Sequence, residues 1–231
     1  MSNVFPRRPE IASKTWQPRG CQDIRICLYV PRDGVEDMKP SRRDHLVETA
    51  LALFMRDGFH ATGIDGILSR AGVAKMTLYK HFKSKDELIV AALRLGDERF
   101  RDWFTRAVEA KAENPRGRLL ALFGALDEWI NQPDFSGCAF IAAAAEYGRA
   151  DDPIKRAAAG HKHKIRRYVR GLAAEAGAPD ADALADGLNL LLEGAMVTAH
   201  VSGRRDAAKV ARRAATLLIK RALDEGLLSI H

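Results

Sequence analysis

The sequence predicts an all-α protein of about nine helices, in which an N-terminal three-helix unit is followed by a larger helical domain. Three observations support this expectation. The composition is rich in Ala, Leu, Arg and Glu, residues that favour helices. From residue 41 onward, apolar residues recur every three or four positions, which is the spacing of one helix face. A Ser or Thr followed three residues later by an acidic residue, a helix-start signal, occurs at Ser41, Thr62 and Ser84.

These signals divide the chain into segments. The expected helices are 41–58, 62–72, 74–81, a long one from 84 to the break at Asn114-Pro115, 116–130, 138–147, 153–175, 181–201 and 206–225. Prolines cluster in residues 1–40, which show no helical period, and we interpret this segment as a flexible extension. Met38 directly precedes the first helix and is an alternative start of translation, which the intact mass of the native protein would reveal.

The third expected helix, residues 74–81, has two distinct faces. Ala74, Leu78 and Phe82 follow the spacing i, i+4, i+8 and form an apolar stripe. The opposite face displays cationic, thioether and phenol groups, with a hydroxyl at its flank: Lys75, Met76, Tyr79 and Lys80, and Thr77. Lysines neutralise phosphates, a tyrosine packs on a sugar or donates to a phosphate, and methyl and thioether groups meet thymine methyls. This face suits the groove of a nucleic acid; the alternative is a basic corner of a helical bundle.

The surrounding sequence agrees with the nucleic-acid interpretation. Residues 41–95 hold nine Lys or Arg and six Asp or Glu, which is a net charge of +3, out of +7 for the whole chain. The Ala71-Gly72-Val73 turn joins two short helices, which is the arrangement of a helix-turn-helix over about residues 63–82. Thr62, at the start of the second helix, and Lys85, at the start of the fourth, stand where helix amides favour a phosphate.

Residues 41–95 resemble the DNA-binding domain of the tetracycline-repressor (TetR) family of bacterial transcriptional regulators. The matching segments are ETALALFMRDGFHATGIDGI, AGVAKMTLYKHF and KSKDEL. The resemblance implies DNA contacts by Thr62, Lys75, Thr77, Tyr79, Lys80 and Lys85, while Met76 occupies a position that varies in the family. It also implies that residues 96–231 form a helical regulatory and dimerisation domain, that the protein is a homodimer, and that it binds a double-stranded, pseudo-palindromic operator.

The last two helices carry apolar stripes that the resemblance assigns to a dimer interface. The residues expected there are Leu184, Leu188, Leu191, Leu192 and Ala195 of the eighth helix, and Ala207, Ala211, Ala214 and Leu218 of the ninth. Small residues let helices approach closely, and leucines supply buried area. The alternative is that both stripes face the protomer's own core.

An effector pocket is expected inside the bundle of the fourth to eighth helices. Its walls are expected to be aromatic, with a few polar groups that orient the ligand: Trp103, Phe104, Phe123, Trp129, Phe140 and Tyr147, with Glu146, Asn189, Glu193 and His200. Such a pocket favours a mainly apolar or aromatic small molecule. The alternatives are that the aromatic residues simply fill the core, and that Glu193 and His200, seven residues apart, pair with each other.

The sequence predicts no metal and no cofactor. The three cysteines, Cys21, Cys27 and Cys138, lack metal-ligand spacing and are expected to be reduced thiols. His161 and His163 are two residues apart, hence on different helix faces, which argues against a metal site. They adjoin KIRRYVR, a basic run that we interpret as a solvated face; the alternative is a site for an anionic effector or an acidic partner.

The leading hypothesis is a cytoplasmic, sequence-specific transcriptional regulator, a repressor that a small-molecule effector releases from its operator. One alternative is a helical enzyme with Glu146 or Glu193 as general base, although no nucleophile–base set, phosphate-binding glycine loop or metal-ligand cluster is evident. The other is an architectural protein whose DNA binding depends on salt but little on sequence. The start, MSNVFPRRPE, lacks the apolar segment of a secretory signal, and no run reaches the roughly 18 apolar residues of a membrane span.

Overall fold

The computed structural model describes residues 41–228, and their side chains as far as Asp224. Within this range the chain forms α-helices and no strand, which confirms the all-α expectation. The helices are α1 (Arg42–Asp57), α2 (Ile64–Ala71), α3 (Lys75–His81), α4 (Lys85–Glu109), α5 (Pro115–Ile130), α6 (Ala139–Glu146), α7 (Pro153–Glu175), α8 (Ala181–Ser202) and α9 (Ala207–Leu228). The expected extension 1–40 and the alternative start at Met38 lie outside the described residues. Among the described helices, none is both long and apolar enough to cross a membrane.

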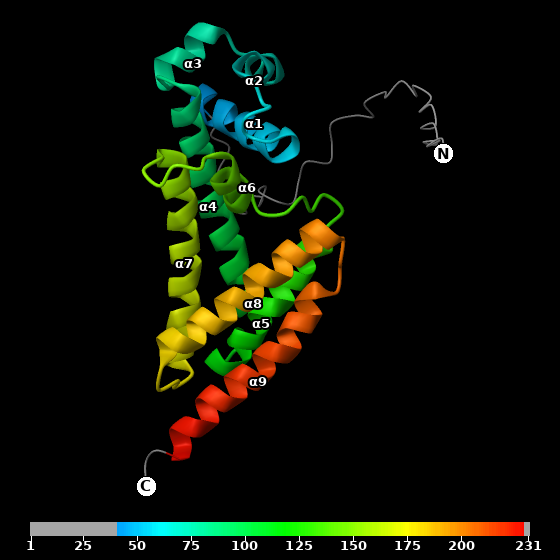
Figure 1. The fold of residues 1–231 in the computed structure, drawn as a ribbon. Coiled ribbons are helices and arrows are strands. Elements are labelled where there is room, and N and C mark those ends of the chain that lie inside the picture. Colours follow the sequence, from blue (N-terminus) through cyan, green and yellow to red (C-terminus); the bar gives the residue numbers. More distant parts are fainter. Residues whose placement is uncertain (1–40, 229–231) are drawn as a thin grey trace, which may run out of the picture.

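The helices form an elongated molecule (Figure 1). α1, α2 and α3 pack together at one end, and α5, α8 and α9 pack together at the other. The long helices α4 and α7 run between the two ends and pack against each other. The short α6 packs on α7 near the middle of the molecule, between the two groups of helices.

Two of the three predicted helix starts are confirmed by their side-chain caps. The Ser41 hydroxyl oxygen accepts the backbone N–H of Asp44 at 3.1 Å, and that of Ser84 accepts the N–H of Glu87 at 3.2 Å. Each bond satisfies an amide that has no partner within its own helix, which fixes where α1 and α4 begin.

The third predicted start, a cap by Thr62 with Asp65, is wrong. α2 begins at Ile64, its cap position is Gly63, and Thr62 is buried behind it. The Thr62 hydroxyl donates to the backbone carbonyl of Gly58 at 2.6 Å instead. A threonine hydroxyl can bond to a carbonyl four residues before it as readily as to an amide ahead of it, so the sequence pattern alone did not decide between the two.

Two hydrophobic cores hold the molecule together, one near each end. The first is built from α1, α2, α3 and the start of α4, and it also includes residues of α6 and of the first half of α7. The second joins the rest of α4 and α7 to α5, α8 and α9. α4 therefore contributes to both cores, with Leu88 and Leu93 in the first and Phe104 and Val108 in the second.

The residues predicted for the dimer interface mostly lie in the second core. Six of them are buried within their own protomer: Leu184, Leu188, Leu192, Ala195, Ala207 and Ala211. Leu191 and Leu218 are half-buried, and only Ala214 of the predicted set is exposed. The interface prediction is therefore wrong for the buried residues, and the alternative, that the stripes face the protomer's own core, holds for them. α8 is apolar around much of its circumference, so its periodicity did not reveal which face turns inward.

Candidate DNA-binding surface and effector pocket

The short helix α3 is anchored at one end of the molecule by two side chains. Leu78 is completely buried and Phe82, directly after the helix, is 4% exposed. The third residue of the predicted stripe, Ala74, is exposed, so that part of the prediction is wrong. Ala74 has an extended backbone, φ −71° and ψ 151°, and precedes the helix rather than continuing its apolar face.

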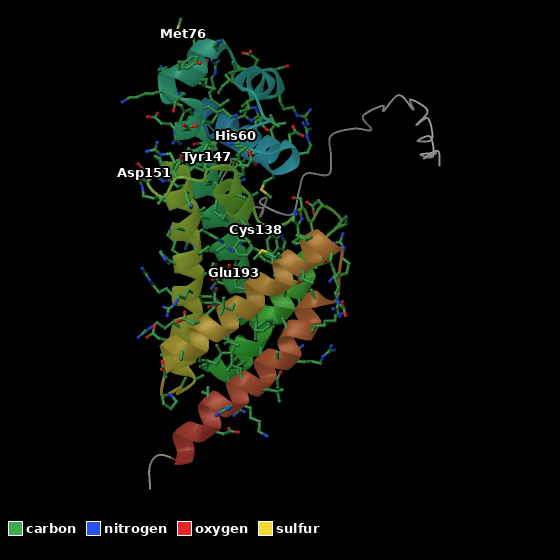
Figure 2. All side chains as sticks on the ribbon, viewed as in Figure 1. His60, Met76, Cys138, Tyr147, Asp151 and Glu193 are labelled. Carbon is green, nitrogen blue, oxygen red and sulfur yellow. The ribbon has the colours of Figure 1, made fainter. Side chains whose placement is uncertain are left out.

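The opposite face of α3 is open to solvent, as the sequence predicted. Met76 is 82% exposed and Tyr79 52% exposed, and Figure 2 shows Met76 at the far tip of the molecule. Lys75 and Lys80 are exposed as well, and Thr77 is half-buried beside them. The phenol, the thioether and both ammonium groups of this face are therefore accessible to a partner.

The turn before α3 has the geometry of a helix-turn-helix. Gly72 adopts a left-handed conformation, φ 65° and ψ 32°, which glycine reaches without a side-chain penalty. The N–H of Val73 then donates to the carbonyl of Leu68 at 3.2 Å and closes the end of α2. At the other end of α2, Gly63 is exposed and provides no side-chain cap, which leaves the first amides of α2 accessible to an anion such as a phosphate.

Two predicted DNA contacts are engaged within the protein. The Thr62 side chain is only 5% exposed and its hydroxyl bonds to backbone carbonyls, so it does not belong to the accessible face. The Lys85 side chain is half-buried, and its ammonium group donates to the carbonyl of His60 at 3.2 Å. Lys85 therefore ties the start of α4 to the turn that follows α1.

That same turn is held from the other side by α6. The carboxylate of Glu146, the last residue of α6, accepts two consecutive backbone N–H groups, from Phe59 at 3.0 Å and from His60 at 2.6 Å. The His60 imidazole lies 2.9 Å from the Glu146 carbonyl through Nε2 and stacks on the Tyr147 ring, with centroids 4.7 Å apart. Figure 2 shows His60 and Tyr147 next to each other at this contact. We call these four residues the turn contact.

Burial affects the acidity of Tyr147 at the turn contact. Burial of the phenol raises the pKa of Tyr147 to about 12, and the negative charges of Asp86, Glu146 and Asp152 add to this rise. The phenol is therefore uncharged at neutral pH. Glu146 and Tyr147, predicted to line an effector pocket, contact the turn after α1 instead, because α6 ends there and its last residues point away from the bundle interior.

A cavity lies next to the opposite end of α6. Its empty space, open mouth included, is about 650 Å³. The lining residues come from α1, α4, α5, α6, α7, α8 and the loop before α6: Met55, Phe100, Phe104, Leu126, Trp129, Gly137, Cys138, Ala139, Phe140, His161, Lys162, Ile165, Asn189, Leu192, Glu193 and Met196. The cavity thus occupies the predicted region between the fourth and eighth helices.

Five of the predicted pocket residues line this cavity: Phe104, Trp129, Phe140, Asn189 and Glu193. Phe123 is instead buried in the second core, and Trp103 packs against Phe100 and Phe104 without lining the cavity. The wall residue Phe100 was missed, although its position four residues before Phe104 places both on the same face of α4. Met55 carried no such signal, because it comes from α1, far away in the sequence.

Glu193 is the main polar group of the cavity, and its partners differ from those expected. Its carboxylate accepts the side-chain N–H of Asn189 at 3.1 Å and lies 3.6 Å from the Lys162 ammonium. His200, predicted to line the pocket, is not among the lining residues, and the alternative pairing of Glu193 with His200 is replaced by these two partners. The His200 ring lies against Gly137 in the loop before α6, so closely that a Cβ on this glycine would be 2.7 Å from the ring.

The basic run on α7 is not a solvated patch as a whole. Arg166 forms ion pairs with Asp182 and Asp186 of α8, and Arg170 pairs with Asp182. His161 is buried and stacks on Phe140, with ring centroids 3.7 Å apart and the planes at 9°. The solvated-face interpretation is therefore wrong for His161, whereas Arg166 and Arg170 keep solvent access while they pair with carboxylates of α8 that the sequence of α7 does not reveal.

His161 bonds to a buried carboxylate in the middle of α4. Its Nδ1 lies 2.9 Å from the Asp97 carboxylate, which also accepts hydrogen bonds from the side chains of Arg101 and Lys164. Burial alone raises the pKa of Asp97, but the hydrogen bonds from these three partners outweigh it and hold the pKa well below its ordinary value. Burial lowers the pKa of the His161 imidazole, and the Asp97 charge opposes this only in part. The pair is therefore a carboxylate and a neutral imidazole near neutral pH.

The described residues contain no group of three or more His, Cys, Asp or Glu side chains that are arranged to hold a metal ion. Cys138 is a free thiol that lines the cavity. The other two cysteines, Cys21 and Cys27, lie outside the described residues.

Comparison with known proteins agrees with this geometry. Residues 46–92 match the family described as bacterial regulatory proteins, tetR family, and residues 115–215 match the tetracyclin repressor-like C-terminal domain. A TetR-family transcriptional regulator from Streptomyces coelicolor has 31% sequence identity and a TM-score of 0.72, and the match covers 79% of this chain and 96% of that one. The chain belongs to the TetR family of bacterial transcriptional regulators. It is a DNA-binding regulator of transcription, with an N-terminal helix-turn-helix and a larger helical C-terminal domain.

Two named relatives are similar over shorter stretches. The transcriptional activator FasR of Mycolicibacterium smegmatis is 29% identical over 159 residues, which cover 62% of this TetR-family chain and 72% of FasR. The transcriptional repressor KstR2 of Mycobacterium tuberculosis is 38% identical over 101 residues, 42% of this chain. That match spans about half of KstR2, 48% of its length.

The neutral state of His161 leads to a pH prediction. The imidazole should titrate below its ordinary pKa of about 6.5, because its burial disfavours the charged form. As the pH falls from there toward the lowered pKa, the unfolded chain binds a proton that the folded chain does not, so this residue makes the free energy of unfolding decrease. NMR titration of histidine ring signals measures the pKa, with His161→Gln to assign the resonance. A His161 signal that titrates at or above 6.5 would contradict the prediction.

Proposed function

We propose that this TetR-family protein is a repressor that leaves its operator when a small molecule occupies the cavity beside α6. The observation that supports it most directly is the solvent-exposed face of α3, anchored from behind by Leu78 and Phe82. Repression is supported by relatives that are named repressors, KstR2 and the Escherichia coli protein NemR, although FasR is named an activator. A regulator of this kind acts where the bacterial chromosome lies, in the cytoplasm.

On the operator, α3 would enter the major groove with its exposed face. Lys75 and Lys80 carry the charge for phosphate contacts, and Tyr79 adds a phenol that packs on a sugar or donates to a phosphate. Met76 and Thr77, at the tip of the same face, are suited to base edges through their thioether and methyl groups. The Lys85 ammonium group already donates a hydrogen bond to the His60 carbonyl, and it must divide or break this bond to bind a phosphate. We therefore give Lys85 a secondary role in DNA binding.

Selection of bound fragments from a genomic or random DNA library would test the proposal and supply the operator. A repressor should enrich one pseudo-palindromic sequence and keep it against a large excess of unrelated DNA. Binding that depends on salt but not on sequence would instead indicate an architectural protein.

Replacement of Tyr79 or Lys80 by alanine is expected to weaken operator binding without loss of folding. Each variant removes an exposed side chain that does not belong to the first core, so the free energy of unfolding should change by less than about 0.5 kcal/mol. Loss of the Lys80 charge should also reduce the dependence of log affinity on log salt by about one unit. Fluorescence anisotropy with labelled operator at several salt concentrations measures both effects. Unchanged affinity in both variants would remove α3 from the DNA interface.

The dimer interface is proposed on the outer faces of α8 and α9 rather than on the residues first predicted. Leu190, Val197 and Val201 of α8 lie at spacings of seven and four residues, hence on one side of the helix, and all three are exposed. Leu217 of α9 is 71% exposed, and Ala214 is exposed one turn before it. A cluster of large apolar side chains open to water on adjacent helices is typical of a protein–protein interface.

A charge at Leu217 is therefore expected to break the dimer. The variant Leu217→Glu would bury a carboxylate in the proposed apolar interface, whereas Thr216→Glu, on the neighbouring polar side of α9, serves as the matched control. Light scattering after size-exclusion chromatography should give the mass of a monomer for the first variant and of a dimer for the second. If Leu217→Glu remains dimeric, the interface lies elsewhere.

The cavity suits a mainly apolar ligand with one polar end. Most of its wall is aromatic or aliphatic, and its polar groups gather where Glu193, Lys162 and Asn189 meet. The opposite charges of Glu193 and Lys162 balance each other, so the site favours a neutral molecule with a hydroxyl, amide or similar group over an ion. Figure 2 shows Glu193 on the bundle below Cys138, away from the DNA-binding end.

Filling this cavity should abolish ligand binding. Met196 lines the cavity, and Met196→Trp would occupy its space, whereas Arg167→Trp places the same side chain on the exposed surface of α7, outside the cavity. Neutral two-ring aromatic compounds that raise the melting temperature of the wild type should still do so in Arg167→Trp but not in Met196→Trp. A melting-temperature shift that persists in Met196→Trp would place the ligand elsewhere.

A further inference from the structure

We propose that the Glu146 carboxylate couples the cavity to the DNA-reading helix by holding the turn after α1, and that loss of this contact lowers operator affinity. The proposal rests on the proposed function, because it concerns how that pocket and that DNA-binding face communicate. It assigns to Glu146 a positioning role: the side chain contacts neither DNA nor the cavity, and it acts through the turn.

The eight residues of α6 face the cavity at one end and the turn at the other. Phe140, in its first turn, lines the cavity and stacks on His161, while Glu146, its last residue, bonds to the amides of Phe59 and His60. Phe140 and Glu146 are six positions apart, which is about 9 Å along the helix axis. A helix this short moves as one rigid piece, so a shift at Phe140 is transmitted to Glu146.

The cavity also touches the same stretch of α1 directly. Met55, two residues before the end of α1, lines the cavity, and the turn contact begins four residues later at Phe59. Gly58 between them has φ 89°, a conformation that other residues rarely adopt, and a Cβ there would lie 3.4 Å from the Glu146 carboxylate. A ligand in the cavity therefore contacts the end of α1 directly, through Met55. It also acts on the turn after α1 indirectly, through α6.

The turn contact is strong enough to matter energetically. A carboxylate that accepts two amide N–H groups forms charge-assisted hydrogen bonds, which are about twice as strong as neutral ones. Removal of such an acceptor leaves the amide of Phe59, a residue whose side chain is fully buried, without its partner. The stack of His60 on Tyr147 and the bond from Lys85 to the His60 carbonyl fix the turn further.

From this turn, a displacement reaches the reading helix through rigid connections. Thr62 ties the turn to α1 through its bonds to Gly58 and Leu53, and α2 starts two residues later. α2 leads through the Gly72 turn into α3, and Lys85 links the turn to the start of α4. A ligand that parts Phe140 from His161, whose rings lie 3.7 Å apart, favours a displaced α6. It thereby disfavours the arrangement in which both α3 helices of a dimer match successive major grooves.

The test compares three variants on the selected operator. Glu146→Ala removes both hydrogen bonds and should raise the operator Kd by about 5- to 150-fold, the range of a typical coupling between sites. Glu146→Gln keeps one acceptor oxygen and should give a smaller rise. Glu113→Gln, an exposed glutamate in the connection between α4 and α5, is the matched control and should bind like the wild type.

Amide hydrogen exchange distinguishes coupling from a purely structural role of Glu146, because only coupling makes exchange at the turn depend on bound operator. Exchange at Phe59 and His60 should be faster in Glu146→Ala than in the wild type. Because coupling is reciprocal, saturating operator should also slow exchange at these two amides in the wild type. Circular dichroism and light scattering check that each variant is folded and dimeric; if Glu146→Ala fails to fold, Glu146→Gln carries the test.

The outcomes separate this inference from the proposed function. Faster exchange at Phe59 and His60 with an unchanged operator Kd would overturn the coupling role of Glu146, as would an exchange rate that operator does not alter. If Lys80→Ala weakens binding while both Glu146 variants bind like the wild type, the DNA-binding face stands and the coupling fails. If Tyr79→Ala and Lys80→Ala also bind like the wild type, the DNA-binding face itself is wrong.

Discussion

The reading surface of this protein depends on the burial of two side chains behind a helix that cannot exist alone. α3 has seven residues and no side-chain cap, and a helix of that length is not stable in water. Leu78 and Phe82 hold it against the first core, which leaves its other face free. The exposed face that we propose to meet DNA therefore depends on core packing behind it.

The same first core explains how a ligand site can influence that face. It is not confined to α1–α3: Ala139, Phe140 and Ala143 of α6 and Ile154 of α7 belong to it. Phe140 is shared between this core and the wall of the cavity, and Cys138 packs against both cores. The cavity and the core behind the DNA-binding helices are thus built partly from the same side chains.

Helix positions were readable from the sequence wherever a local cause sets them. Ser41 and Ser84 cap α1 and α4, Pro153 begins α7, and Gly72 ends α2, each through a bond or a backbone preference within a few residues. Local patterns also showed which side of α3 is polar. Thr62 marks the limit of this approach, because its hydroxyl had two local partners available and took the carbonyl behind it.

The sequence by itself determined the helical class, the order and approximate ends of the helices, and the composition of the DNA-reading face. Only the tertiary structure decided which of two apolar faces of α8 turns inward, where Leu188 is buried and Leu190 exposed. It also decided that Glu146 binds the turn after α1, and that Met55 and His161 reach the cavity. The hydrogen bond between Glu146 and Phe59 joins residues 87 positions apart, and the contact between His161 and Asp97 joins residues 64 positions apart. No periodicity or cap within one helix encodes which distant helix that helix will face.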